Sequence, residues 1–283
     1  MMHRDLPNTD RTPATTTAQV LAPATGLQDG RMTAHTVTPE QKTERVYQVF
    51  QTISDDYDRM NDVISFGRHR AWKRELIRAI RSCKPARVLD VASGTGDIAL
   101  KLARACPSAD IVAGDFSENM LAVADRRFRA AGVTNIRVLH ENAMALSFPD
   151  DTFDVACISF GLRNMPDYAA VISQMTRVLR PGGYFFCLDS SYPTNPVVKP
   201  FFRLYFKHLM PLFGRLVAHA PDEYRWLNDS TEAFLSKGQL AVLMQHCGLT
   251  GVGVRSFMLG GAALHWGRKP DAHTTPAVGE LDV

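Results

Sequence analysis

Short apolar segments alternate with amphipathic ones through the middle of this 283-residue chain. The apolar segments have the length of strands, and strands are predicted at 87–91, 110–115, 136–141, 153–160 and 183–189. Between them apolar residues recur at helical spacing, which predicts helices over 97–106, 118–131 and 168–179. A repeated strand–helix–strand order with nearly continuous apolar strands is typical of a parallel sheet with helices on both faces.

Further elements are predicted on both sides of this alternation. Amphipathic helices are expected at 44–53, at 71–80 and, after a capping box formed by Ser236 and Gln239, up to Cys247. Strands at 250–256 and 261–267 are expected to close the sheet as a hairpin. An aromatic-rich helical insertion is predicted from about 193 to 235. The chain therefore reads as one domain over 41–270, with a disordered leader at 1–40 and a loose tail at 271–283.

Composition excludes several classes of protein. The hydrophobic fraction of 45% is that of a globule with a full core, and the net charge of +3 is too small to indicate nucleic-acid binding. The five cysteines are scattered and form no CxxC pair, which argues against a disulfide framework or a zinc site and favours a reducing cytoplasm. No run of uncharged apolar residues approaches 18, so no membrane span is predicted.

The first predicted strand, 87–91, runs into a glycine turn, Ala92-Ser93-Gly94-Thr95-Gly96-Asp97. Gly94 and Gly96 are expected to let the backbone approach a ligand that a Cβ would hold away. A nicotinamide dehydrogenase needs G-x-G-x-x-G, but Ile98 and Ala99 stand where the third glycine is required. The spacing disfavours pyrophosphate binding and fits S-adenosylmethionine, which has no phosphate.

Suitable polar groups also follow the next three predicted strands. Asp115 can accept hydrogen bonds from both hydroxyls of a ribose, and a solvated loop acid is the less favoured alternative. Asn142 and Ala143 are placed to meet an adenine edge, and Ser159 the methionine end of the cofactor. Taken singly, Asn142 and Ser159 are more typical of turn or core residues. Four successive strand ends with such groups favour a cofactor site at the carboxyl edge of the sheet.

These motifs resemble the seven-strand class I methyltransferases and, more narrowly, the C-methyltransferase family of menaquinone and ubiquinone biosynthesis. The resemblance covers about 44–269 and rests on Tyr57-Asp58-x-Met60-Asn61, His69, Trp72, the glycine turn, Asp115-Phe116-Ser117-Glu118-Asn119-Met120-Leu121, Asn142-Ala143-Met144, Phe148-Pro149-Asp150-Asp151-Thr152-Phe153-Asp154, Gly161-Leu162-Arg163-Asn164 and Arg177-Val178-Leu179-Arg180-Pro181-Gly182-Gly183. It implies an α/β fold: a Rossmann-like seven-strand sheet with N-terminal helices and a helical insertion after strand five. Two positions depart from the family pattern: Ser93, where many members have glycine, and Asp189, where relatives usually have glutamate.

The resemblance implies S-adenosylmethionine-dependent methylation of a ring carbon of demethylmenaquinol, giving menaquinol. The alternatives are a ubiquinone-pathway benzoquinol, both quinols, a nicotinamide dehydrogenase, or a membrane-peripheral binding module without catalysis. The cofactor contacts it implies are Thr95, Asp115, Asn142, Ala143 and Ser159.

Three residues are candidates for the chemistry. Arg163 stays cationic and is expected to stabilise a phenolate or hold a proton-accepting water, while Asn164 orients that water or a quinol oxygen. Without the resemblance, a loop-capping Arg and Asn would be the favoured interpretation. Tyr57 is expected to cover the pocket, with a packed aromatic lid as the close alternative. His69 is interpreted as structural and left out of this set. No metal is expected, because the histidines show no ligand spacing.

The insertion bears on the partners of the protein. Its apolar residues at 201–217 offer a wall for the tail of a polyprenylated naphthoquinol. Its basic stripe, Arg203, Lys207 and Arg215, suits anionic lipid headgroups at the inner face of the cell membrane. The plainer interpretation is a core-packing helix with a solvated basic face. A homodimer is compatible with the sequence, and no nucleic-acid partner is expected.

Overall fold

The computed structural model describes residues 67–193, 196, 197, 200, 204 and 230–271. Their centre is a seven-stranded sheet with the order β3-β2-β1-β4-β5-β7-β6. The strands are β1 (Arg87–Val91), β2 (Asp110–Asp115), β3 (Ile136–His140), β4 (Phe153–Ser159), β5 (Leu179–Ser190), β6 (Thr250–Phe257) and β7 (Ala262–Arg268). The first five are parallel, and β7 runs antiparallel between β5 and β6. The predicted sheet and its closing hairpin are confirmed.

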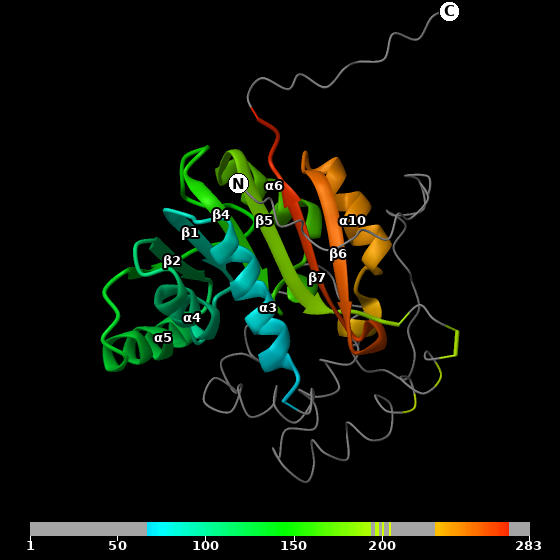
Figure 1. The fold of residues 1–283 in the computed structure, drawn as a ribbon, viewed down its shortest axis with the longest axis horizontal. Helices are drawn as coiled ribbons and strands as arrows, with labels where there is room; N and C mark the ends of the chain where they lie inside the picture. The colour runs from blue at the N-terminus through cyan, green and yellow to red at the C-terminus, as the bar shows by residue number, and fades with distance from the viewer. Residues whose placement is uncertain (1–66, 194–195, 198–199, 201–203, 205–229, 272–283) are drawn as a thin grey trace, which may run out of the picture.

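Helices cover both faces of this sheet (Figure 1). They are α3 (His69–Ser82), α4 (Asp97–Ala105), α5 (Glu118–Ala130), α6 (Tyr168–Val178) and α10 (Lys237–His246), with short 3₁₀ helices η2 (Leu162–Asn164) and η5 (Met258–Gly260). Their bounds match the predicted helices closely. The Oγ of Ser117 accepts a hydrogen bond from the backbone N–H of Met120 at the start of α5, and Ser236 forms the predicted capping box with Gln239. The predicted helix at 44–53, the leader, most of the insertion and all but the first residue of the tail lie outside the described residues.

One boundary differs from its prediction. β5 begins at Leu179 rather than at 183, because Leu179 already pairs with Phe153 of β4. The register then shifts, so that the next pair is Val155 with Tyr184. The Pro181-Gly182-Gly183 sequence therefore forms a bulge inside the strand rather than a turn before it, and Gly182 takes a φ of 78° there.

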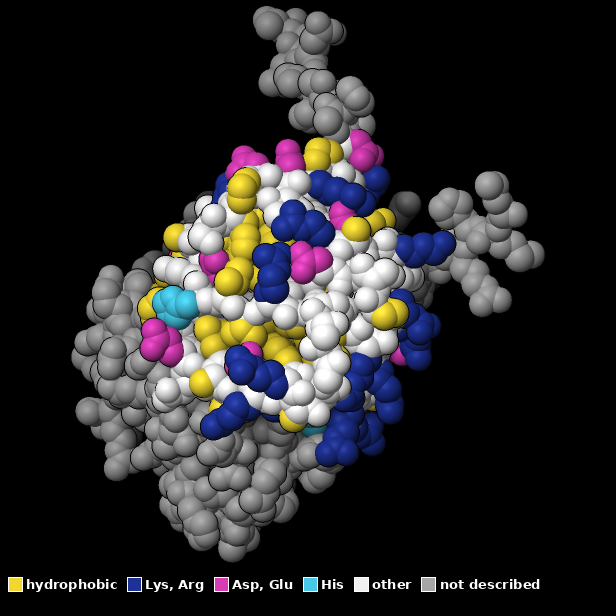
Figure 2. Space-filling view, turned by 90° about the vertical axis from the view of Figure 1, so that its left-hand side faces the viewer, with side chains coloured by type: hydrophobic (Ala, Val, Ile, Leu, Met, Phe, Trp, Pro, Cys, Tyr) yellow, Lys and Arg dark blue, Asp and Glu magenta, His cyan; other side chains and the backbone are white. Residues whose placement is uncertain are grey.

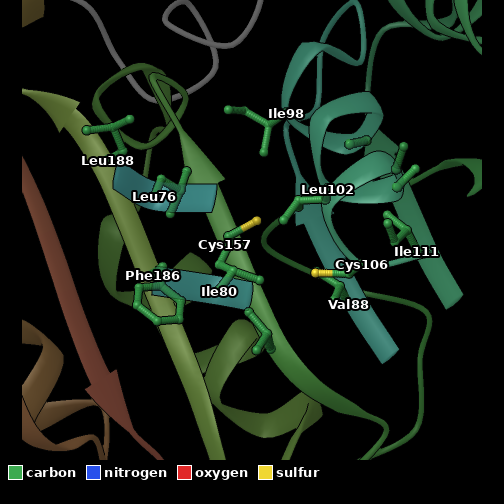
Figure 3. Close-up of a cluster of buried hydrophobic side chains, with 14 of the residues drawn as sticks. Leu76, Ile80, Val88, Ile98, Leu102, Cys106, Ile111, Cys157, Phe186 and Leu188 are labelled. Atoms are coloured by element: carbon green, nitrogen blue, oxygen red, sulfur yellow. The ribbon is translucent and has the colours of Figure 1, made fainter. Parts of the chain in front are cut away.

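The core has two parts, one on each face of the sheet. On the first face, side chains of α3 and α4 meet those of β1, β4 and β5; Figure 3 shows Ile80 beside Phe186, and Leu76, Leu102 and Val88 in the same cluster. On the second face, α6 and α10 pack against the same strands, with Ile172 and Met244 fully buried. The strands that carry the predicted site are therefore clamped from both sides, which fixes where their carboxyl ends lie.

The described surface carries mixed charge. Figure 2 shows the side of α4 and α5, where Lys and Arg side chains share the face with Asp and Glu and apolar side chains lie in the hollows between them. Among the described residues, no helix is long and apolar enough to cross a membrane. In the same part of the chain no cluster of His, Cys, Asp and Glu could hold a metal ion.

Candidate active site

The order of the strands reverses between β1 and β4, and a cavity lies at this topological switch point. From β1 the strands proceed outward to β2 and β3, whereas β4 and β5 lie on the other side of β1. Ligands of open α/β sheets bind outside the carboxyl ends of the strands at such a point. The cavity is lined by Lys73, 92–95, Asp97, Ile98, 115–117, Met120, 141–144, 159–161 and 164–166.

The two glycines of the β1–α4 turn serve different purposes. Both have left-handed backbones, with φ of 57° at Gly94 and 78° at Gly96. A Cβ on Gly94 would meet no atom within 4 Å, and Gly94 lines the cavity. A Cβ on Gly96 would lie 2.3 Å from the Phe128 ring, and Gly96 does not line the cavity. The absence of a Cβ at Gly96 makes room for an aromatic ring of α5, and a contact of Gly96 with the cofactor stays a prediction.

Asp115, at the end of β2, faces the cavity with both carboxylate oxygens already oriented. Its Oδ2 accepts the backbone N–H of Gly94 at 2.8 Å, and its Oδ1 that of Ser117 at 2.9 Å. Burial raises the pKa of Asp115, while these backbone N–H donors oppose the rise by favouring the charged form. The side chain thus ties the glycine turn to β2, and its carboxylate is fixed in the cavity wall.

Two buried hydroxyls in the cavity wall have no protein partner among the described residues. They are the Oγ of Ser93, in the glycine turn, and the Oγ of Ser159, at the end of β4. Buried polar atoms are nearly always hydrogen-bonded, so these two indicate a ligand with its own polar groups. Together with the open space at Gly94, they suit S-adenosylmethionine, whose sugar and amino-acid ends are polar.

The other predicted cofactor residues also reach this cavity. Thr95 is 4% exposed and its Oγ1 accepts a hydrogen bond from Arg127 at 2.8 Å, so this hydroxyl is partly committed to α5. The Oδ1 of Asn142 accepts the N–H of Met144 at 3.0 Å, which holds the turn after β3. Ala143 is buried beside it. Six of the seven predicted cofactor residues therefore share one cavity, the exception being Gly96.

Arg163 is held in the interior of the protein by an ion pair. Its guanidinium donates to Asp189 at 2.6 Å and to the carbonyl of Phe160 at 2.8 Å, and both side chains of the ion pair are 3% exposed. Arg163 does not line the cavity, whereas its neighbour Asn164 does. Asp189 holds the guanidinium in the interior, and a direct role of Arg163 toward the substrate stays a prediction.

The register of the sheet places Asp189 beside Arg163. Ser159 pairs with Leu188, so the next residue of β5 lies beside the turn that follows β4. The Asp189 carboxylate also accepts the backbone N–H groups of Arg163 at 3.2 Å and Ser190 at 2.7 Å. It therefore ties the end of β5 to η2, the element that carries Asn164.

Sequence reasoning missed several residues of the cavity wall, chiefly Lys73, Asp97 and Glu141. Lys73 is 5% exposed and follows the buried Trp72 on α3, and a lysine among apolar helix positions was the available signal. The Glu141 carboxylate accepts hydrogen bonds from the backbone N–H and the hydroxyl of Ser147. His69, left out as structural, is buried on α3 and does not line the cavity. Tyr57 lies outside the described residues.

The sheet order and the cavity at its switch point define a class I methyltransferase that uses S-adenosylmethionine. The chain belongs to the ubiE/COQ5 methyltransferase family, whose model matches residues 37–269. It is 46% identical over 235 residues to a demethylmenaquinone methyltransferase of Bacillus cytotoxicus, an alignment that covers 82% of this chain and 99% of the relative. It is 44% identical over 231 residues to the protein of that name from Geobacillus kaustophilus, with 81% and 99% covered.

Solved structures agree on the fold. The chain is similar, with a TM-score of 0.55 and 18% identity, to an S-adenosylmethionine-dependent methyltransferase of Thermotoga maritima described as a possible histamine N-methyltransferase; 79% of this chain and 99% of that one are covered. It is also similar to a possible exported protein of Bordetella parapertussis, with a TM-score of 0.56, 18% identity and 71% and 68% covered. At this identity the likeness concerns the fold alone.

Proposed function

We propose that this protein transfers the methyl group of S-adenosylmethionine to a ring carbon of demethylmenaquinol, which gives menaquinol. The names of relatives that are 46% and 44% identical over nearly their whole lengths support this substrate. The observation that carries the proposal is a shared cavity: Asn164 and Met165, in the loop after β4, line the same space as Gly94 and Ser159. A methyl acceptor at that loop would lie beside the methionine end of the cofactor.

The cofactor would lie across the carboxyl ends of the first four strands. Asp115 would accept hydrogen bonds from the ribose hydroxyls, and Asn142 with Ala143 would border the adenine. Gly94, Thr95 and Ser159 would surround the methionine end. The buried hydroxyl of Ser159 and the open space at Gly94 support this orientation, since both suit a polar ligand that closely approaches the backbone.

The chemistry asks mainly for alignment and for removal of one proton. A quinol carbon beside a hydroxyl becomes a strong nucleophile when that hydroxyl is deprotonated, and the sulfonium methyl is already a good electrophile. Holding carbon, methyl and sulfur in line can supply several kcal/mol of the barrier. Asn164 would orient a quinol oxygen or a proton-accepting water, and Arg163 would act through its hold on the η2 turn. Tyr57 stays a candidate lid.

The finer partners form a separate part of the proposal. Residues 201–217 would pack against the polyprenyl tail, and Arg203, Lys207 and Arg215 would rest on anionic lipid at the inner membrane face. The sequence pattern alone supports this, because these residues lie outside the described part of the chain. Vesicle flotation of a charge-reversed triple variant tests the lipid contact, and analytical ultracentrifugation tests the homodimer.

Labelled-methyl transfer tests the function directly. Purified protein is given S-adenosylmethionine with labelled methyl and either demethylmenaquinol or a ubiquinone-pathway benzoquinol. The expected result is label on the naphthoquinol ring carbon, with a much lower rate on the benzoquinol. Cells that lack the protein should then accumulate demethylmenaquinone. Label on the benzoquinol alone, or on neither quinol while cofactor binds, would contradict the proposed substrate.

A further inference from the structure

One wall of the cavity contains a buried ion pair between two helices. The ammonium of Lys73, on α3, donates to the Oδ2 of Asp97, the first residue of α4, at 2.8 Å. The Lys73 side chain is 6% exposed and that of Asp97 20% exposed. Both residues line the same cavity as Gly94 and Ser159. A positive and a negative charge therefore stand side by side at the place proposed for the methionine end of the cofactor.

A buried ion pair is not needed simply to hold α3 against α4. Removing a lysine from water is costly, and an apolar side chain of similar volume generally stabilises a helix contact as well or better. Trp72, Leu76 and Ile80 already bury this face of α3, and Leu76 and Ile80 are visible in Figure 3. The contact of α3 with the sheet is thus made by apolar groups, so helix packing alone does not account for a lysine in the cavity wall.

Asp97 also has a second cationic partner. The carboxylate of Asp97 is shared, because its Oδ1 accepts a hydrogen bond from Lys101 while its Oδ2 accepts one from Lys73. Lys73 and Lys101 therefore share one carboxylate, and of the two only Lys73 lines the cavity. A carboxylate divided between two ammonium groups leaves each of them able to interact with a further anion such as a ligand carboxylate.

We propose that Lys73 and Asp97 bind the amino-acid end of S-adenosylmethionine, with the Lys73 ammonium on its carboxylate and the Asp97 carboxylate on its ammonium. The inference rests on the proposed cofactor and adds the zwitterion-binding residues to it. It also assigns α3, an element before the sheet, to the cofactor site. Pairing of the Lys73 and Asp97 charges with the carboxylate and the ammonium of the cofactor explains both the burial of Lys73 and its position in the cavity wall.

Binding calorimetry on the full chain separates ligand binding from a purely structural role. The two ligands are S-adenosylhomocysteine and 5′-methylthioadenosine, which share adenosine and thioether but differ in the amino-acid group. Lys73→Met should weaken S-adenosylhomocysteine about 10- to 100-fold and leave methylthioadenosine within about twofold. Lys101→Met is the matched control, because Lys101 shares Asp97 but does not line the cavity, and it should leave both affinities nearly unchanged.

A second measurement needs no variant. The wild-type protein should bind the decarboxylated analogue of S-adenosylhomocysteine, which keeps the amine, at least about tenfold more weakly than S-adenosylhomocysteine. Equal affinity for these two ligands, or an equal loss of both ligands in Lys73→Met, would overturn the assignment and leave the pair as a brace. Wild-type protein that binds neither adenosyl ligand would instead refute the proposed cofactor, and this inference with it.

Discussion

Two ion pairs join neighbouring elements at the carboxyl edge of the sheet, and they differ in what surrounds them. Arg163 and Asp189 are sealed in the interior, each side chain 3% exposed, and protein groups take up further hydrogen bonds of both. Lys73 and Asp97 form a contact of 2.8 Å, against 2.6 Å for the first pair, but they stand in the cavity wall. The first pair fixes a loop, whereas the second borders the cavity in which we propose that the cofactor binds. Position, and not residue type, decides whether a buried charge braces or binds.

The first test of this comparison replaces one residue of the interior pair, Arg163 or Asp189. Asp189→Ala or Arg163→Met should lower the free energy of unfolding by about 3–5 kcal/mol, because the remaining charge is buried without its partner. The double variant Arg163→Met, Asp189→Leu should recover much of that loss. Urea unfolding measures both. A cost below about 1 kcal/mol in the single variants would mean that water reaches the pair.

A change of pH tests a carboxyl that lacks such a partner. Burial raises the pKa of Asp90 from 3.8 to about 7, and its Oδ2 has no hydrogen-bond partner among the described residues. Between pH 4 and 7 the unfolded chain releases this proton while the folded protein keeps it, so stability should fall, by at most about 4 kcal/mol. Above pH 7 this contribution is constant.

Asp90→Asn should remove that slope. The unfolding free energy of the variant relative to wild type should therefore rise between pH 4.5 and pH 7.5, as measured by urea unfolding at both values. Asp110→Asn is the control, because Asp110 is partly exposed at the start of β2 and paired with Arg137. The same slope in wild type and Asp90→Asn would show that another group titrates.

The two glycines of the β1–α4 turn extend the comparison, because Gly96 packs against protein and Gly94 lines the cavity. Gly96→Ala should cost about 2–4 kcal/mol of stability, since its Cβ would overlap the Phe128 ring and its backbone is left-handed. Gly94→Ala should cost only the strain of about 1–2 kcal/mol, but its Cβ would enter the cavity and weaken cofactor binding. Thermal unfolding and calorimetry separate these effects. Equal stability loss in both variants would contradict the assignment.

The smallest expected effect concerns Asp115. Asp115→Ala should weaken S-adenosylhomocysteine by about 1.5–3 kcal/mol, because the ribose hydroxyls lose a charged acceptor and the Gly94 N–H loses its anchor. Asp110→Ala, at the other end of β2, is the matched control and should bind normally. Calorimetry gives both affinities. An unchanged dissociation constant for Asp115→Ala would remove Asp115 from the cofactor site.

Most of the described fold follows from local patterns. The strands and helices were predicted within a few residues, as were the caps at Ser117 and Ser236, because periodicity and capping depend on residues close in sequence. The strand-end positions of Asp115 and Ser159 followed as well, since parallel strands bring their carboxyl ends to one edge. The bulge at 180–183 was missed because it depends on pairing between β4 and β5.

The sequence by itself determined the sheet, its switch point and the family to which the chain belongs. Only the tertiary structure decided which way individual side chains face. Arg163 turns inward because Asp189, 26 positions later, lies near the end of β5, and Gly96 is glycine because Phe128 packs over it. Lys73 reaches the cavity because α3 packs beside α4, 24 residues further on. Contacts between residues so distant in sequence leave no local periodicity, so packing alone separates a ligand from a brace.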